Sequence, residues 1–183
     1  MSNIVFTNGV LDILTPAHIN LLLLCRKWAG PEGQVIVGID SDEKVRQDKG
    51  PNRPIFSIQE RQQALLALKN GLDPIVDAVY GFESNKQLHE LISFIKPSII
   101  IKGSDWKGNV IGSDIADRVI YFDLDPRFST SKTIEKVLTK NLYKLTSSST
   151  PPSGIKPICT CSMKFEDGEW WHTTEACAGK KRL

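Results

Sequence analysis

Apolar and polar residues alternate in blocks along about the first 140 residues, and each block has the length of one strand or one helix. Runs of consecutive apolar residues are typical of strands buried on both faces of a parallel sheet. They predict strands at Asn3–Thr7, Gln34–Ile39, Ala78–Phe82, Ser98–Ile101 and Val119–Leu124. Apolar residues at helical spacing predict helices from about His18 to Trp28, from Ser57 to Asn70, from Lys86 to Ile95, and from near Ser131 through Leu138.

This alternation of strands and helices predicts one α/β domain with a doubly wound, Rossmann-like, five-stranded parallel sheet. The helix from Ser57 also has Ser57 and Glu60 at the spacing of a capping box. Ligands of such sheets bind beyond the carboxyl ends of the strands. We therefore expect a ligand to contact the segments 8–18, 40–53, 102–114 and 125–132.

The chain after this domain changes in composition. The segment around SSSTPPSG is rich in Ser, Pro and Gly and reads as a linker. We expect a domain over residues 1–142, a linker over 143–157 and a small appendix over 158–183. Two short β-like stretches around Asp167 and Gly168 predict a hairpin in the appendix.

The appendix holds three of the four cysteines, and about 25 residues cannot bury a core unaided. Four side chains could bind a structural Zn²⁺ ion: Cys159, Cys161, His172 and Cys177. Alternatively, Trp170 and Trp171 hold the tail against the main domain with its thiols free, or two cysteines form a disulfide. The sequence leaves these alternatives open. The fourth cysteine, Cys25, stands in a leucine run and is expected to be buried.

Composition and charge argue against several classes of function. Hydrophobic residues make up 40% of the chain and charged residues 24%, as in folded globular proteins. The 23 basic and 21 acidic residues form no long block of either sign, which argues against a nucleic-acid or membrane-surface partner. The apolar stretch Ile13–Cys25 is interrupted by polar residues and has no basic leader, so we expect neither a signal peptide nor a membrane span, and a cytoplasmic protein.

The first expected ligand segment reads T-N-G-V-L-D-I-L-T-P-A-H from Thr7 to His18. Gly9 permits close approach of a ligand to the backbone. Thr15 and His18 stand three residues apart at a helix entrance, where free N–H groups favour phosphate. The alternative is that Thr15 only caps the helix and His18 is a partly exposed helix residue.

Three later segments carry further polar groups. Lys49, Arg53 and Arg61 could face a phosphate, or could be solvated and paired charges. I-K-G-S-D-W-K-G over 101–108 follows a strand directly, and could be a polar turn with Trp106 packed over an edge. D-P-R-F-S-T-S-K-T-I over 125–134 offers hydroxyls and helix N–H groups to phosphate, or is simply a helix cap.

The four segments, in their order along the chain, resemble motifs of the cytidylyltransferase-like nucleotidyltransferase superfamily. Gly9, Asp12, Thr15 and His18 match the first motif, with Leu11 at a usual aromatic position and Ala17 at a usual glycine. The later segments resemble the K-G-x-x-R-P, E-x-R, K-G-G-D-Y or G-D-D-W-x-G, and S-T-T motifs. The branches that the chain resembles are the adenylyltransferase half of the bacterial ADP-heptose synthesis enzyme and glycerol-3-phosphate cytidylyltransferase.

The resemblance implies transfer of a nucleoside monophosphate from ATP or CTP to a sugar or polyol phosphate, with Mg²⁺ carried by the triphosphate, in a homodimer. The implied catalytic residues are Thr15, His18, Lys49 and Arg61. The implied nucleotide-binding residues are Thr7, Asn8, Gly9, Asp12, Lys102, Gly103, Asp105, Ser129, Thr130 and Ser131. The implied residues for the second substrate are Asp40, Arg53, Trp106 and Arg127.

Two other functions compete with this one. The chain could be a non-catalytic nucleotide-binding or scaffold protein, with Leu11 and Ala17 marking an impaired pocket and the appendix recruiting a partner. The retained charges Lys49, Arg61, Lys102 and Asp105 argue against that function. Flavin or phosphopantetheine adenylylation is a third possibility, and the K-G-S-D-W and S-T-S segments weaken it.

Overall fold

A computed structural model describes residues 3–123, 125, 127–131, 133–134, 163–166 and 169–172. The chain divides into two compact units, Met1–Leu142 and Tyr143–Leu183. Within the described residues, no helix is long and apolar enough to cross a membrane.

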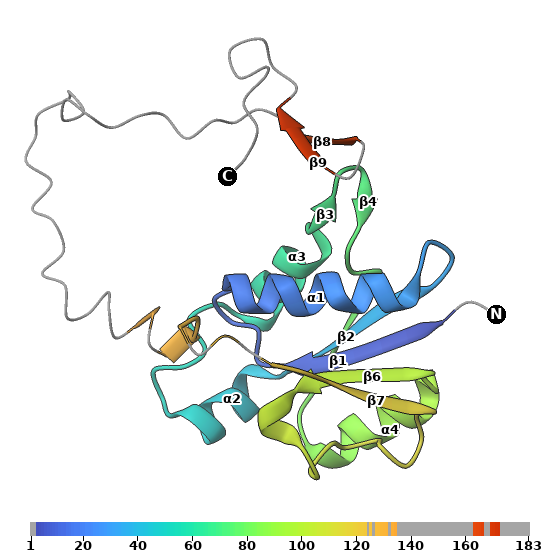
Figure 1. Cartoon of the computed structure of the whole chain (residues 1–183). Coiled ribbons are helices and arrows are strands. Elements are labelled where there is room, and N and C mark those ends of the chain that lie inside the picture. The colour runs from blue at the N-terminus through green and yellow to red at the C-terminus, as the bar shows by residue number, and fades with distance from the viewer. Residues whose placement is uncertain are drawn as a thin grey trace, which may run out of the picture. The chain divides into compact units, whose positions relative to one another are not determined.

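The first unit is built on a parallel sheet of five strands, as predicted (Figure 1). Its strands are β1 (Ile4–Gly9), β2 (Gln34–Asp40), β5 (Ala78–Phe82), β6 (Ile99–Gly103) and β7 (Arg118–Phe122). Their order across the sheet is β5-β2-β1-β6-β7, and each neighbouring pair is parallel. The chain therefore builds outward from β1 in both directions, which leaves a crevice beyond the carboxyl ends of the central strands.

Helices cover both faces of the sheet. They are α1 (Pro16–Ala29), α2 (Asp42–Lys49), α3 (Ile58–Leu66) and α4 (Asn85–Ile95), with a short 3₁₀ turn, η1, at Ser104–Trp106. Alternate residues of each strand point to opposite faces. Val5 packs with α1 and α3 in one buried cluster, whereas Phe6 packs with α4 in the other. Full burial of side chains such as Leu22 and Ile92 stabilises the fold by about 1.5–3 kcal/mol each.

Cys25 is fully buried in α1, as expected. Burial raises the pKa of its thiol to about 12, and the backbone at Cys25 and the charge of Arg26 oppose that shift. The thiol therefore stays protonated and unreactive at neutral pH.

Two elements differ from the sequence-based expectation. The helix expected to run to Asn70 ends at Leu66, because β3 (Lys69–Asn70) and β4 (Asp73–Pro74) pair around a turn. Gly71 permits that turn through its positive φ of 66°. The start of α3 is as predicted: the Ser57 backbone N–H donates to the Glu60 carboxylate (2.8 Å), and the Glu60 N–H donates to the Ser57 hydroxyl (3.4 Å).

The helix α2 lies within the segment 40–53, where the apolar pattern predicted no helix. Val45 is its one buried residue, so its sequence carries no apolar periodicity. Its start is fixed by Ser41, whose hydroxyl accepts a hydrogen bond from the Lys44 N–H (3.2 Å). The helix expected after Ser131 begins as predicted, with residues 130–131 and 133–134 helical, and its later part lies outside the described residues, as does Leu124.

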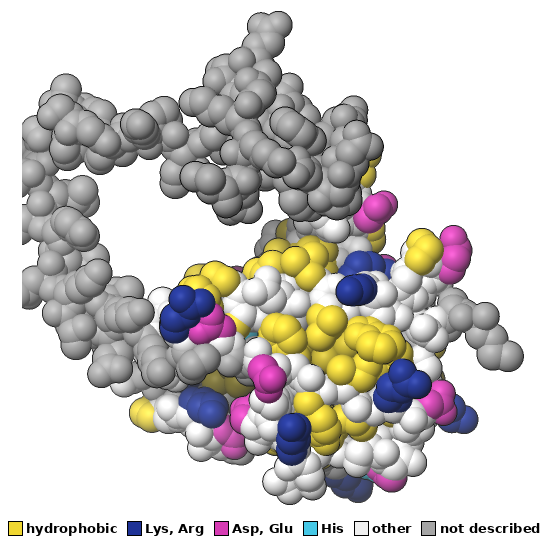
Figure 2. Space-filling view, viewed as in Figure 1, with side chains coloured by type: hydrophobic (Ala, Val, Ile, Leu, Met, Phe, Trp, Pro, Cys, Tyr) yellow, Lys and Arg dark blue, Asp and Glu magenta, His cyan; other side chains and the backbone are white. Residues whose placement is uncertain are grey.

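Figure 2 shows one face of the molecule, with basic and acidic side chains interspersed around an apolar area where α1 and β7 lie. Trp28 of α1 and Tyr121 of β7 are each 37% exposed. The visible face therefore has no surface of a single charge sign, in line with the balanced composition. The expected homodimer stays a prediction.

In the second unit, β8 (Met163–Glu166) pairs antiparallel with β9 (Glu169–His172). This confirms the hairpin predicted around Asp167 and Gly168. Cys159, Cys161 and Cys177 lie outside the described residues, as does the side chain of His172. The zinc, free-thiol and disulfide alternatives for this unit therefore stay open.

Candidate functional site

Two cavities open beyond the carboxyl ends of the strands, with volumes of about 220 and 660 Å³. The predicted site residues that line the smaller, first cavity are Thr7, Asn8, Gly9, Asp12, His18, Lys49, Arg53, Lys102, Gly103, Trp106, Ser129, Thr130 and Ser131. Asp40 lines the larger, second cavity. The residues that line both cavities are Asn8, Gly9, Val10, Lys49, Lys102 and Trp106. The fold thus brings four distant segments to one place.

Four predicted site residues, Thr15, Arg61, Asp105 and Arg127, line neither cavity. Arg127 is exposed, and its Nε donates to both carboxylate oxygens of Asp125 (3.0 and 2.9 Å). Asp105 is exposed on the η1 turn. Thr15 and Arg61 are buried in the structure around the cavities.

Thr15 and His18 together form the start of α1. The Thr15 N–H donates to His18 Nδ1 (3.1 Å), and the Thr15 hydroxyl lies 3.2 Å from the same atom. Since Nδ1 accepts a backbone hydrogen bond, we assign the proton of the neutral ring to Nε2, which makes Nε2 a donor. Burial lowers the pKa of His18, and the Ile13 carbonyl opposes that shift. Thr15 thus fixes a neutral imidazole at a helix N-terminus on the wall of the first cavity.

Arg61 has a structural role next to the site. Its side chain has no exposed surface. The guanidinium donates to the carbonyls of Phe56 (3.1 Å), Val10 (2.7 Å) and Asp40 (2.8 Å), and to the carboxylate of Asp42 (2.7 Å). It therefore joins the loop after β1, the end of β2 and the starts of α2 and α3. The resemblance implied that Arg61 binds phosphate directly. Its buried placement does not fit that role.

Asp12 has a similar structural role beside the first cavity. Its carboxylate accepts hydrogen bonds from the N–H groups of Ile55 (2.9 Å) and Phe56 (2.9 Å) and from Arg53 Nε (2.9 Å). The Asp12 side chain has no exposed surface, whereas that of Arg53 is 14% exposed. Asp12 therefore holds the segment before α3 and orients Arg53 at the cavity.

A model of the family described as cytidylyltransferase-like matches residues 6–149, which include every residue that lines the two cavities. The chain belongs to the cytidylyltransferase-like family.

Individual cytidylyltransferase-like relatives agree with this assignment. The bifunctional protein HldE of Campylobacter jejuni is 42% identical over 138 residues, which are 75% of this chain and 28% of that protein. HldE of Sulfurimonas denitrificans is 38% identical over 135 residues, 73% of this chain and 26% of that protein. The chain thus spans about a quarter of the length of these relatives.

A solved structure of the lipopolysaccharide core biosynthesis protein from Thermoplasma volcanium also resembles the chain. The TM-score is 0.55, with 25% sequence identity, over 68% of this chain and all of that protein. The Rossmann-like nucleotidyltransferase fold predicted from the sequence is thereby confirmed.

Lys102 stands at the boundary between the two cavities of this cytidylyltransferase-like domain. Its Nζ donates to the backbone oxygen (2.9 Å) and the side-chain oxygen (3.2 Å) of Asn8. The same ammonium lies 4.5 Å from the centre of the Trp106 ring. Burial lowers the pKa of Lys102 to about 8, and the carboxylates of Asp40 and Asp105 oppose that shift.

The residues around the start of the helix that follows Ser129 line the first cavity. The Thr130 hydroxyl donates to the Ile13 carbonyl (3.1 Å), which ties this turn to the loop after β1. The Thr133 N–H donates to the Ser129 carbonyl (2.9 Å). Thr7 adds another hydroxyl: it is 1% exposed, and its Oγ1 has no hydrogen-bond partner among the described residues. A buried hydroxyl without a partner costs free energy, and a hydrogen bond from this hydroxyl to a ligand would remove that cost.

The two departures from the family motif have separate places. Leu11 has a left-handed backbone with φ 47°, packs in the core and lines the first cavity. Ala17 is 2% exposed in α1 and lines neither cavity. The Ala17 methyl group therefore does not take up space in either cavity. The left-handed backbone of Leu11 is locally strained and lies beside the first cavity.

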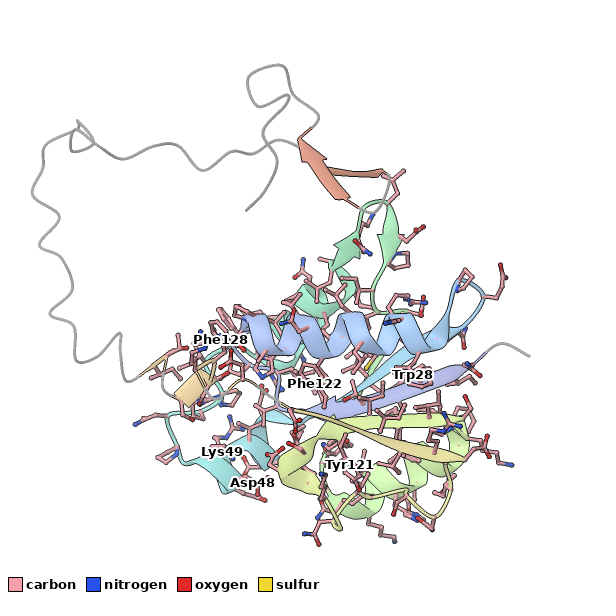
Figure 3. All side chains as sticks on the ribbon, in the orientation of Figure 1. Trp28, Asp48, Lys49, Tyr121, Phe122 and Phe128 are labelled. Carbon is pink, nitrogen blue, oxygen red and sulfur yellow. The ribbon has the colours of Figure 1, made fainter. Side chains whose placement is uncertain are left out.

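Sequence reasoning missed four polar or charged residues that line the second cavity: Lys44, Asp48, Asn85 and Asn109. Lys44 and Asp48 belong to α2, which the apolar pattern did not reveal. The signal that could have found them is charge spacing, because Asp40, Lys44 and Asp48 stand four residues apart. Figure 3 shows Asp48 and Lys49 side by side at the end of α2.

The described residues include no group of three His, Cys, Asp or Glu side chains that could hold a metal ion. The Asp12 carboxylate is occupied by Arg53 and two backbone N–H groups, and Asp40 is paired with Lys44. The donor set of these two cavities therefore suits a divalent ion that arrives on substrate phosphates rather than one held by the protein alone.

Proposed function

We propose that this chain transfers a nucleoside monophosphate, most simply AMP from ATP, to the phosphate of a sugar such as heptose-1-phosphate, releasing pyrophosphate. The observation that carries the proposal is the pair of adjoining cavities that share Lys49 and Lys102. Two phosphorylated substrates can meet at these two ammonium groups, one from each cavity. The similarity to the HldE proteins supports ATP and a heptose phosphate over CTP and glycerol-3-phosphate.

In the reaction, an oxygen of the acceptor phosphate attacks the α-phosphorus in line, and the bond from that phosphorus to the bridging oxygen of the β-phosphate breaks. Pyrophosphate takes the electron pair, so no covalent enzyme intermediate forms. Members of the family use Mg²⁺, which would enter with the triphosphate and neutralise part of its charge. Catalysis by the protein is then positioning and charge stabilisation.

The residues of this chain divide that work. His18 Nε2 and the N-terminus of α1 donate to the phosphate that becomes pentacoordinate. Lys49 and Lys102 stabilise its added negative charge from the boundary of the cavities. The hydroxyls and N–H groups at Ser129–Ser131 bind the leaving phosphates. Thr15, Asp12 and Arg61 hold these groups in position through the hydrogen bonds described above.

The test is a matrix of pyrophosphate-release assays with Mg²⁺, crossing ATP and CTP with heptose-1-phosphate, glycerol-3-phosphate and no acceptor. Release that requires both ATP and the heptose phosphate, and that His18→Ala abolishes, is the expected result. Release with CTP and glycerol-3-phosphate instead would move the chain to that branch. Silence throughout, with ATP still bound by calorimetry, would overturn the proposal in favour of a non-catalytic nucleotide-binding protein.

Thr7→Val should weaken binding of the triphosphate without weakening the fold. The substitution removes only the unpartnered hydroxyl and keeps the β-branched shape. The loss of one neutral hydrogen bond raises the dissociation constant by up to about tenfold. Calorimetric titration with ATP and thermal unfolding of the free protein measure the two effects. An unchanged dissociation constant would remove the Thr7 hydroxyl from the ligand site.

The activity should fall as the pH rises through about 8, because the Lys102 ammonium then loses its proton. A profile of kcat/KM against pH reports ionisations of the free enzyme, and that of kcat reports those of the complex. Bound phosphates favour the charged ammonium, so the fall in kcat should lie at higher pH than the fall in kcat/KM. Lys102→Arg keeps a positive charge at all these pH values, so the fall in activity at alkaline pH should disappear. If the fall persists in this variant, it belongs to the ionisation of another group.

A further inference from the structure

The Lys102 ammonium has only neutral direct partners, although it is a buried charge. Lys102 is 5% exposed, and burial disfavours its charged form. The ammonium donates to the backbone and side-chain oxygens of Asn8, and its other contact is the face of the Trp106 ring, 4.5 Å away. Among the described residues, no carboxylate forms an ion pair with Lys102. Its positive charge is therefore held in place without being neutralised by a direct partner.

Other charged groups act on this ammonium from further away. The carboxylates of Asp40 and Asp105 attract it. Asp40 forms its ion pair with Lys44 (3.2 Å), and Asp105 is exposed on η1. Lys49 lines both cavities and adds a second positive charge at their boundary. The direct contacts that fix the position of the Lys102 ammonium are thus its two neutral partners.

An aromatic ring suits this position better than a carboxylate. The negative face of the ring attracts an ammonium, although the ring has no net charge. A carboxylate in the same position would also hold the ammonium, but it would repel an incoming phosphate. Trp106 and Lys102 both line the two cavities. The ring therefore holds a positive charge where two phosphorylated ligands can reach it.

The local structure places the ring beside the ammonium. The turn η1 directly follows β6, the strand that carries Lys102. The Lys107 N–H donates to the Ser104 carbonyl (3.3 Å), and the Asn109 N–H donates to the Trp106 carbonyl (3.0 Å). Trp106 is 47% exposed, so its ring is not part of the core. Its replacement should therefore leave the fold largely unchanged.

We propose that Trp106 is a positioning residue for Lys102: a cation–π contact holds the buried ammonium at the boundary of the two cavities and leaves its charge available to a substrate phosphate. This inference rests on the proposed function, in which Lys102 acts on the phosphates. It goes beyond that function because Trp106 acts through Lys102, and not by contact with the second substrate as the resemblance implied.

A double-mutant cycle of Trp106→Leu and Lys102→Met tests the inference. The readouts are the dissociation constants of inorganic tripolyphosphate and of ATP, each with Mg²⁺, by calorimetric titration. Trp106→Leu should raise both constants by about five- to thirtyfold, the range for a cation–π contact shielded from water. In the Lys102→Met background the same substitution should have no further effect, because no ammonium remains for the ring to hold. Trp106→Phe keeps an aromatic face and should recover part of the affinity.

The matched control is Trp28→Leu, which should bind both ligands like the wild type. Trp28 lies on α1, is 37% exposed, and has the Arg118 guanidinium 5.8 Å from its ring centre. It lines neither cavity. Thermal unfolding of each variant checks the fold. Since tripolyphosphate has no base or sugar, a loss of affinity confined to ATP would mean that the Trp106 ring contacts the nucleoside, and would overturn the inference.

Two further results would also overturn it: an effect of Trp106→Leu that persists in the Lys102→Met background, or no effect in either background. Both would leave the proposed function standing. A wild type that shows the expected coupling but releases no pyrophosphate with any acceptor would be a failure of the proposed function alone. A wild type that binds neither ATP nor tripolyphosphate would overturn both.

Discussion

His18→Ala is expected to lower the turnover number by about 10²- to 10³-fold, the usual cost of removing one donor to a developing charge. The neutral imidazole is held by the Thr15 N–H at Nδ1, which leaves its Nε2 proton for a phosphate oxygen. Since this interaction strengthens as negative charge builds on the phosphate, kcat should fall more than the affinity for the triphosphate. Steady-state kinetics together with calorimetric titration of ATP separate the two quantities.

The matched control is His89→Ala. His89 lies on α4, about half exposed beside Asp114, and lines neither cavity. It should keep wild-type turnover. Circular dichroism and thermal unfolding show whether α1 remains folded without the His18 acceptor for Thr15. A His18→Ala protein that is folded and turns over at the wild-type rate would exclude His18 from the chemistry.

Arg61→Ala is expected to destabilise the domain by about 3–5 kcal/mol, the range for breaking a buried ion pair by removing one partner. Four hydrogen bonds disappear, and three backbone carbonyls and the Asp42 carboxylate lose their donor. A loss of this size is a large part of the total stability of an ordinary domain. Chemical denaturation followed by circular dichroism gives the change in the free energy of unfolding.

The control for this prediction is Arg46→Ala on α2. Arg46 pairs with Glu43 at an exposed site, where removing a surface ion pair costs less than about 1 kcal/mol. A direct role of Arg61 in gripping phosphate predicts a different pattern, in which stability is kept and only the KM values rise. The changes in the free energy of unfolding and in KM therefore decide whether Arg61 has a structural role or contacts the ligand.

Much of the fold could be predicted from sequence because the central strands β2 and β6 are almost entirely buried. Runs such as QVIVGI have one stable place, inside a sheet covered on both faces. α2 could not be found in this way, since Val45 is its single buried residue and its helix is stabilised by the Ser41 cap and charged pairs. The early end of α3 also escaped prediction, because the pairing of Lys69–Asn70 with Asp73–Pro74 is a tertiary preference that helix propensity does not reveal.

The candidate site shows the same division. The residue types at His18, Lys49 and Lys102 and their positions after strands were sufficient to place them at one sheet edge. The direction of a side chain was not predictable. Arg61 lies in the first turns of α3 like any exposed arginine, yet its guanidinium turns inward to the nearby Phe56 carbonyl and to the Val10 and Asp40 carbonyls, which are distant in sequence. Whether a charge serves the ligand or the scaffold depends on such long-range partners.

The parallel arrangement of the sheet also determines where the protein can be attached to something else. Asn3, just before β1, lies at the edge opposite the cavities, where its carbonyl accepts from the Gln34 N–H (2.9 Å) and its side-chain amide donates to the Trp28 carbonyl (3.1 Å). The six residues of β1 separate that edge from the cavities by about 20 Å, at roughly 3.3 Å per residue. A carrier domain, affinity handle or solid support joined ahead of Asn3 would therefore leave the openings of both cavities accessible to small phosphorylated molecules.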